Sequence, residues 1–161
     1  MHEVQRIEEE VDKPKPGIQL AHTFKEEFSG KKEYIVRKVE AECDHGLVVS
    51  NLEKKLRSMG LAAGNSYPMD LYILNPGRQI TVLFEVKTDS TSTSCYEAIG
   101  QLFFYSARLI KKPQLVAVFP NSLDRHYIDI LEEIGLQTLT YRWVNNMPCF
   151  NEHEIGELLT V

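Results

Sequence analysis

Two carboxylates and a lysine are the residues of this sequence whose types and spacing could do chemistry. Glu85 and Lys87 stand two apart at the end of the apolar run ITVLFEVK, and Asp70 precedes them in YPMDLYIL. Alternate residues of a strand share a face, so Glu85 and Lys87 project together. Two carboxylates that converge without a paired arginine favour a hard cation such as Mg²⁺. An adjacent lysine suits phosphodiester hydrolysis, because it can orient or deprotonate the attacking water and offset charge on the phosphate.

A β-hairpin must bring these three groups together. Two alternating apolar runs on either side of the turn string NPGR predict that hairpin. With NPGR as the loop, Leu74 lies opposite Gln79 and Asp70 lies opposite Leu83. Asp70 and Glu85 are then diagonal neighbours on one face, with their backbones roughly 7 Å apart. A slip of one residue would move Asp70 to the other face, so the prediction depends on the register.

A long helix is expected before the hairpin. Apolar residues at helical spacing predict it over much of residues 33–59, with its end at Gly60 and a break near Gly46 left open. His45 lies on nearly the same face as these apolar residues, so it could point toward the site. The alternative is a hydrogen-bonded histidine of the core.

A second helix follows the loop STSTS, with Ser94 as its expected N-cap and Pro113 at its exit. Gln101 and Tyr105 are one turn apart on this helix and share a face. We expect this polar line to face the end of the Glu85 strand. The alternative is that Tyr105 is a core aromatic and that Gln101 borders solvent.

The remaining elements predict the fold class. The apolar run QLVAVF is typical of a strand buried on both faces, LQTLTYRW predicts a further strand with a helix between the two, and residues 152–159 predict a short helix. An antiparallel pair followed by helix-linked parallel strands gives an α/β fold, with a mixed central sheet flanked by helices on both faces. The breaker string KPKPG marks residues 1–17 as a flexible leader, which leaves 18–161 as one domain.

Composition narrows the class of protein. Three cysteines without CxxC spacing argue for a reducing compartment and against a disulfide framework or zinc site, with small buried hydrophobes as their expected role. No apolar run reaches the length of a membrane span and the N-terminus lacks a secretory signal, so a cytoplasmic location is expected. The formal net charge of −5 speaks weakly against nucleic acid. Basic clusters such as KK, RK, KKLR and RLIKK leave open a local basic surface or simply solvated helix faces.

Taken together, the motifs resemble a known family. Asp70, then Glu85-Val86-Lys87, then Gln101-Leu-Phe-Phe-Tyr105 resemble the PD-(D/E)xK (restriction-endonuclease-like) nuclease superfamily, with the QxxxY helix of its recombination-type branches. The resemblance covers about residues 41–119. It implies a core of the αβββαβ type, here with a C-terminal extension. It also implies that Asp70, Glu85 and the Val86 carbonyl hold Mg²⁺, for which Mn²⁺ can substitute, and that Lys87 is the catalytic lysine.

Supporting residues and departures also follow from this resemblance. Gln101 and Tyr105 would support the site or touch the substrate backbone. An acidic residue on the first helix often assists the metal in this family, and here Glu53 or His45 is the candidate. The family's PD dipeptide appears as Pro68-Met69-Asp70, and the strand that precedes it has only LAAGNSY available, so it is short or absent.

The expected function is metal-dependent hydrolysis of DNA phosphodiester bonds, by endo- or exonuclease action, in restriction, defence or repair. No separate sequence-reading module is visible, so sequence choice is expected from loops, a homodimer partner or another subunit of a larger system. One alternative is a catalytically inactive module of nuclease fold that binds DNA or protein. Another is an unrelated α/β domain in which Glu85 and Lys87 form a surface pair.

Overall fold

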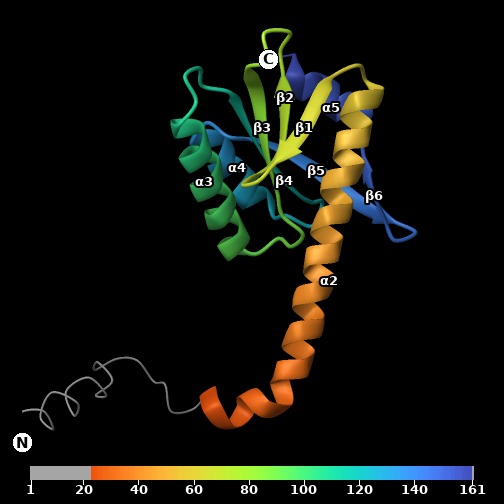
Figure 1. The fold of residues 1–161 in the computed structure, drawn as a ribbon, viewed down its shortest axis with the longest axis vertical. Coiled ribbons are helices and arrows are strands. Elements are labelled where there is room, and N and C mark those ends of the chain that lie inside the picture. The colour runs from red at the N-terminus through yellow and green to blue at the C-terminus, as the bar shows by residue number, and fades with distance from the viewer. Residues whose placement is uncertain (1–22, 161) are drawn as a thin grey trace, which may run out of the picture. The chain divides into compact units, whose positions relative to one another are not determined.

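The structure, a computed structural model, describes residues 23–160, with side chains from residue 39 onward. The chain divides into two compact units, Met1–Glu40 and Ala41–Val161. The first is represented by the beginning of a helix alone, and the predicted leader at residues 1–17 lies outside the described residues. The second contains the sheet (Figure 1), and residue 18, where the sequence places the beginning of the domain, lies outside the described residues.

One six-stranded sheet in the order β1-β2-β3-β4-β5-β6 forms the centre of the second unit. Its strands are β1 (Ala62–Ser66), β2 (Met69–Leu74), β3 (Ile80–Val86), β4 (Gln114–Pro120), β5 (Gln137–Val144) and β6 (Met147–Phe150). The first three are antiparallel, β3, β4 and β5 are parallel, and β6 returns antiparallel to β5. The predicted mixed sheet is therefore confirmed, and β1 is the short strand that the sequence left in doubt.

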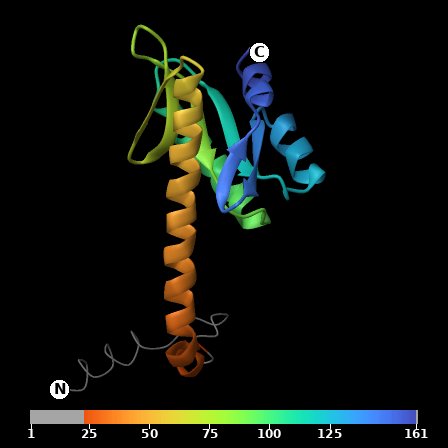
Figure 2. The same ribbon diagram turned by 90° about the vertical axis from the view of Figure 1, so that its right-hand side faces the viewer.

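The described residues form four helices: α2 (Thr23–Ser58), α3 (Ser92–Ala107), α4 (Arg125–Glu133) and α5 (Glu152–Leu159). Figure 1 shows α3 beside β3, and Figure 2 shows α4 and α5 beside the C-terminal strands, in agreement with the contacts that both make with β5. Within the described residues, no helix is long and apolar enough to cross a membrane.

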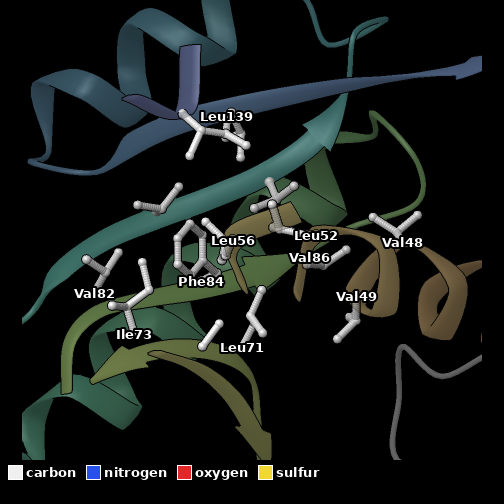
Figure 3. Close-up of a cluster of buried hydrophobic side chains, with 14 of the residues drawn as sticks. Val48, Val49, Leu52, Leu56, Leu71, Ile73, Val82, Phe84, Val86 and Leu139 are labelled. Carbon is white, nitrogen blue, oxygen red and sulfur yellow. The ribbon is translucent and has the colours of Figure 1, made fainter. Parts of the chain in front are cut away.

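Alternation along the central strands divides the core between the two faces of the sheet. Val82, Phe84 and Val86 of β3 face one cluster, to which α2 contributes Val48, Val49, Leu52 and Leu56, and α5 contributes Ile155 (Figure 3). Leu83 faces a second cluster with side chains from α3 and α4. Both faces of β3 are therefore covered, which confirms helices on the two sides of the sheet and explains why the run ITVLFEV is almost wholly apolar.

Helix α2 is longer than the sequence predicts. It begins at Thr23 rather than near residue 33, and it runs without a break through Gly30 and Gly46. Gly46 meets no atom of a neighbouring element within 4 Å of where a Cβ would lie, so no close approach requires a glycine there. A glycine inside a helix lowers its stability by roughly 1 kcal/mol, which the buried apolar stripe of residues 48–56 readily offsets.

Two further local predictions are wrong for identifiable reasons. The N-cap of α3 is Thr91, whose Oγ1 accepts a hydrogen bond from the Ser94 amide, because Asp89 Oδ1 accepts bonds from Thr91 and Ser94 and holds the turn. Strand β6 was missed, although Asn145 and Asn146, both with positive φ, form the two-residue turn typical of a hairpin.

The cysteines are free, as expected, but they are not all buried. Only Cys95 lies in the core, whereas Cys43 and Cys149 are exposed. His126 and His153 are exposed as well.

The predicted hairpin register is wrong by two residues. The Asn75 amide donates a hydrogen bond to the Gln79 carbonyl, and the Gln79 amide donates one to Asn75 Oδ1. Gln79 therefore belongs to the loop, and Leu74 pairs with Ile80 instead. A bulge at Thr81 then adds a second shift of one residue, so that the next partners follow a new register. A single shift would have turned Asp70 to the other face, whereas two shifts return it to the expected one.

Candidate active site at the end of strand β3

The ends of β2 and β3 bring the two predicted carboxylates together. Leu71 and Phe84 are the last paired residues of the β2–β3 ladder, and the same register, continued by one residue, places Asp70 opposite Glu85. They are therefore directly opposite, with about 4.5–5.5 Å expected between the Cβ atoms of such a pair, rather than diagonal neighbours. The structure thus brings Asp70 and Glu85 closer than the predicted register would.

Glu85 is the most unusual residue of the site. It is 2% exposed, and within the described part of the chain it is the only buried residue whose side chain ionises as an acid or a base, apart from the phenol of Tyr141 and the thiol of Cys95. Burial raises the pKa of its carboxyl to about 7, and the negative charge of Asp70 acts in the same direction, while Lys87 opposes both. The positive charge of Lys87 therefore offsets only part of the negative charge of Asp70 and Glu85.

Lys87 is held by three acceptors. Its Nζ lies 3.1 Å from Glu85 Oε1 and 3.4 Å from Glu97 Oε2, and it donates a hydrogen bond of 2.6 Å to Gln101 Oε1. The lysine side chain is 12% exposed, so its ammonium is fixed at the edge of the site rather than free in solvent. Helix α3 returns over the end of β3 and supplies both Glu97 and Gln101.

His45 joins the site from α2. Its Nε2 lies 3.0 Å from Asp70 Oδ2. The hydrogen bond with Asp70 raises the pKa of the imidazole, and the charges of Asp70 and Glu85 act in the same direction against the effect of burial. Of the two alternatives for this histidine, the structure shows the one that points toward Asp70.

The Val86 backbone completes the group of possible oxygen ligands. Its amide donates a 2.9 Å hydrogen bond to Asp70 Oδ2, beyond the last paired residues of the β2–β3 ladder. The N–H and C=O of one residue in a strand point to the same side, so the Val86 carbonyl is directed toward β2 as well. Among the described residues no partner bonds Asp70 Oδ1 or Glu85 Oε2, which leaves both oxygens available.

These residues fit one divalent cation. Across residues 39–160, no three His, Cys, Asp or Glu side chains gather as a metal cluster. A site of two carboxylates and one backbone carbonyl does not need three such side chains, and Mg²⁺ commonly takes one or two carboxylates with waters completing its shell. The burial of Glu85 near the Asp70 carboxylate is the observation that favours a cation, because a positive ion there would offset two neighbouring negative charges.

Two predicted residues are not part of this group. Glu53 instead accepts bonds from Arg57 and Asn65, so it is engaged elsewhere on α2 and β1. Tyr105 packs against the second core cluster and meets Phe104 edge-on. Its hydroxyl makes no hydrogen bond with the part of the chain that is described. Glu53 therefore does not assist Asp70 here, and Tyr105 follows its alternative role as a core aromatic.

Two supporting residues were not predicted as site residues. Glu97 contacts Lys87, and its position four residues before Gln101 on the same helix face was the available signal. Tyr141 of β5 is buried, and its hydroxyl donates a 3.1 Å hydrogen bond to the carbonyl of Lys87. Burial raises the pKa of that phenol. No sequence spacing could reveal this contact, because it joins strands that are separated by β4.

Comparison with known proteins finds no matching family model, no similar curated protein and no similar solved structure. The functional argument therefore rests on the residues of the site and their geometry.

Proposed function

We propose that the chain is a Mg²⁺-dependent nuclease that hydrolyses DNA phosphodiester bonds. The observation that carries this proposal is the buried Glu85, which lies opposite Asp70 and is paired with Lys87. Perturbed carboxyl groups of this kind gather at functional sites more often than elsewhere. The groups beside Glu85 are the Asp70 carboxylate and the Lys87 ammonium, and phosphoryl chemistry uses groups of both kinds.

The order of elements supports membership of the PD-(D/E)xK superfamily as part of the proposal. From α2 to β4 the chain runs helix, three strands, helix, strand, which is the αβββαβ order that the motif resemblance implies. Asp70 lies on the second of these strands, Glu85 and Lys87 lie at the end of the third, and Gln101 lies on the following helix. Strands β5 and β6 with α4 and α5 then form the C-terminal extension.

In this proposal the residues have distinct roles. Asp70, Glu85 and the Val86 carbonyl hold the cation, which supplies Lewis-acid activation of the scissile phosphate. Lys87 orients the attacking water and offsets the charge that develops on the phosphate oxygens. Gln101 and Glu97 position the lysine, and the Tyr141 hydroxyl fixes the backbone at the same residue. His45 orients Asp70.

One observation favours the second candidate, an inactive module of nuclease fold that binds DNA or protein. The ammonium of Lys87 finds three acceptors within the chain, so its charge is satisfied without any substrate. An inactive module would keep this arrangement as a structural network. The two candidates differ in whether the lysine is released to act on a phosphate.

Cleavage of plasmid and single-stranded DNA in Mg²⁺ or Mn²⁺ separates the two candidates. We expect cleavage by the natural sequence, with loss of about 10²- to 10³-fold in Lys87→Ala, because removing a group that stabilises the transition state has effects of that size. Lys54→Ala, at an exposed lysine of α2, is the matched control and should retain full activity. Binding of DNA without cleavage in either metal would leave the inactive module as the better account.

A further inference from the structure

The outer surface of helix α3 carries three exposed aromatic rings. Tyr96 is 68% exposed, Phe104 59% and Phe103 44%, although the same helix buries Ala98 and Leu102 completely. Large apolar side chains gathered on one helix face are unusual on a free surface and indicate contact with a partner. The buried side chains of α3 hold the helix against the sheet, but they give no reason for three aromatic rings on its exposed side.

This aromatic surface borders the candidate active site. Gln101 contacts Lys87, and Phe104 stands three residues after Gln101, so the two are neighbours on the helix surface. The guanidinium of Arg108 lies over the Phe104 ring, 5.2 Å from its centroid. The ring is thus held one turn along from the site and has a fixed positive charge beside it.

A basic pocket continues the surface at the other end of α3. It has a volume of about 340 Å³ and lies between the β2–β3 loop and the end of α3. Arg78, Arg108 and Lys111 line it, together with Gln79 and the apolar side chains of Ile80, Leu109 and Ile110. The lining contains no acidic residue, and none of the three basic side chains forms an ion pair with an acid within the described part of the chain. On a protein of net charge −5, these three side chains make the pocket locally positive.

We propose that this face of α3 binds single-stranded DNA, an inference that rests on the proposed nuclease function and names its substrate class. Bases stack on Phe104 and Tyr96, and the backbone phosphates bind Arg78, Arg108 and Lys111. From Glu97 at the site to Arg108, α3 rises about 16 Å at 1.5 Å per residue. The rings and the pocket together therefore contact a few successive nucleotides of one strand.

The combination of rings and positive charge selects this ligand. Aromatic side chains beside a positive groove are how proteins bind single strands without sequence preference. A duplex offers phosphates to the pocket, but its base faces are already stacked and cannot reach the rings.

Binding measured without metal tests the inference independently of cleavage. Fluorescence anisotropy in EDTA compares labelled dT20, an abasic strand of the same length and charge, and a 20-base-pair duplex. We expect dT20 to bind at least about tenfold more tightly than the abasic strand, since stacking contributes about 1–3 kcal/mol per base. Phe104→Ala should remove most of that difference. Arg78→Ala should weaken dT20 and abasic strand alike and lower the salt dependence of binding by about one phosphate contact.

Trp143→Ala is the matched control, because Trp143 is an exposed aromatic that packs on Tyr141 over the opposite face of the sheet. It should leave the preference for dT20 unchanged. Equal affinity for dT20 and the abasic strand, or tighter binding of the duplex, would overturn the inference, as would a self-association in sedimentation velocity that Phe104→Ala abolishes. The expected binding with no cleavage in Mg²⁺ or Mn²⁺ would remove the nuclease proposal alone. Cleavage without a stacking preference would remove this inference alone.

Discussion

Two ion pairs of this molecule have similar distances and opposite surroundings. Lys87 Nζ lies 3.1 Å from Glu85, with side-chain exposures of 12% and 3%, whereas Arg125 Nε lies 2.8 Å from Asp129, with exposures of 75% and 52%. The exposed pair joins residues four apart on α4 and is screened by solvent. The buried pair ends a central strand and lies beside a second carboxylate, Asp70.

The difference in burial separates a surface contact from a site. An exposed pair contributes about 0–1 kcal/mol and can be lost with little consequence. Removing two charges from water costs several kcal/mol per ion, and a second like charge beside them adds to that. Apolar residues of similar volume would often be at least as stable at a buried position, so stability alone does not account for the buried pair of Glu85 and Lys87.

The largest stability effect is expected at Glu85 and depends on pH. The pKa of its carboxyl is about 7 in the folded protein against the ordinary value of 4.5. The folded state holds the proton more tightly than the unfolded state, so the stability from this group is complete below about pH 4.5 and is lost as the pH rises through 7. The free energy of unfolding should therefore fall by about 3 kcal/mol relative to Glu85→Gln between pH 4.5 and 8.

Urea unfolding at a series of pH values in EDTA measures this difference, because Glu85→Gln keeps the shape of the protonated acid and cannot ionise. Adding Mg²⁺ at pH 8 should recover stability in the natural sequence and not in Glu85→Gln. If the free energy of unfolding depends on pH in the same way in both proteins, Glu85 ionises without a penalty. The buried pair would then not differ from the exposed pair as we argue.

A smaller effect is expected where α3 holds the lysine. Gln101→Ala removes the 2.6 Å hydrogen bond to Lys87 Nζ and leaves the lysine to Glu85 and Glu97. We expect a fall of about tenfold in the rate of metal-dependent cleavage, the size of one charge-assisted hydrogen bond of about 1.5 kcal/mol. The KM for DNA should change little, because the contact is made to the lysine.

Tyr105→Phe is the matched control on the same helix face. Its hydroxyl makes no hydrogen bond with the described residues, and its ring packs in the core. Its cleavage rate should stay within about twofold of the natural sequence. An equal loss in both variants would indicate that α3 as a whole, rather than the Gln101 contact, controls the rate.

The smallest effect is expected at the exposed pair. Arg125→Ala removes the contact with Asp129 on α4. The free energy of unfolding should change by about 0.5 kcal/mol or less, because solvent screens such pairs, and the cleavage rate should not change. Urea unfolding and the plasmid assay check both. A loss above about 1.5 kcal/mol would show that surface pairs of this protein are stronger than the comparison assumes.

Much of the fold could be read from the sequence because local patterns carry it. The period-two runs on either side of NPGR, the apolar run of β4 and the helix at Glu152–Leu159 all appear where they were expected. The hairpin register could not be read, because the bonds of Asn75 to Gln79 and the bulge at Thr81 depend on loop geometry rather than on apolar spacing. The face of Asp70 was predicted correctly only because two shifts cancel.

The site was predictable to the extent that its residues lie on one strand or one helix face. Spacing alone relates Glu85 to Lys87 and Glu97 to Gln101. The contacts of His45 with Asp70 and of Tyr141 with the Lys87 carbonyl join elements far apart in sequence, so tertiary packing decides them. Glu53 was a candidate for the site by its position on the first helix, but its carboxylate contacts Arg57 and Asn65 instead of the site.

Binding of Mn²⁺ tests the central claim most directly, because the account requires Asp70 and Glu85 to hold a divalent cation. Titration followed by the electron paramagnetic resonance signal of free Mn²⁺ should give one site per chain. Asp70→Asn should weaken this site at least about tenfold, while Glu152→Gln, at an exposed carboxylate paired with Lys55, should not. Equal Mn²⁺ affinity in all three proteins, or no binding at millimolar Mn²⁺, would contradict the account.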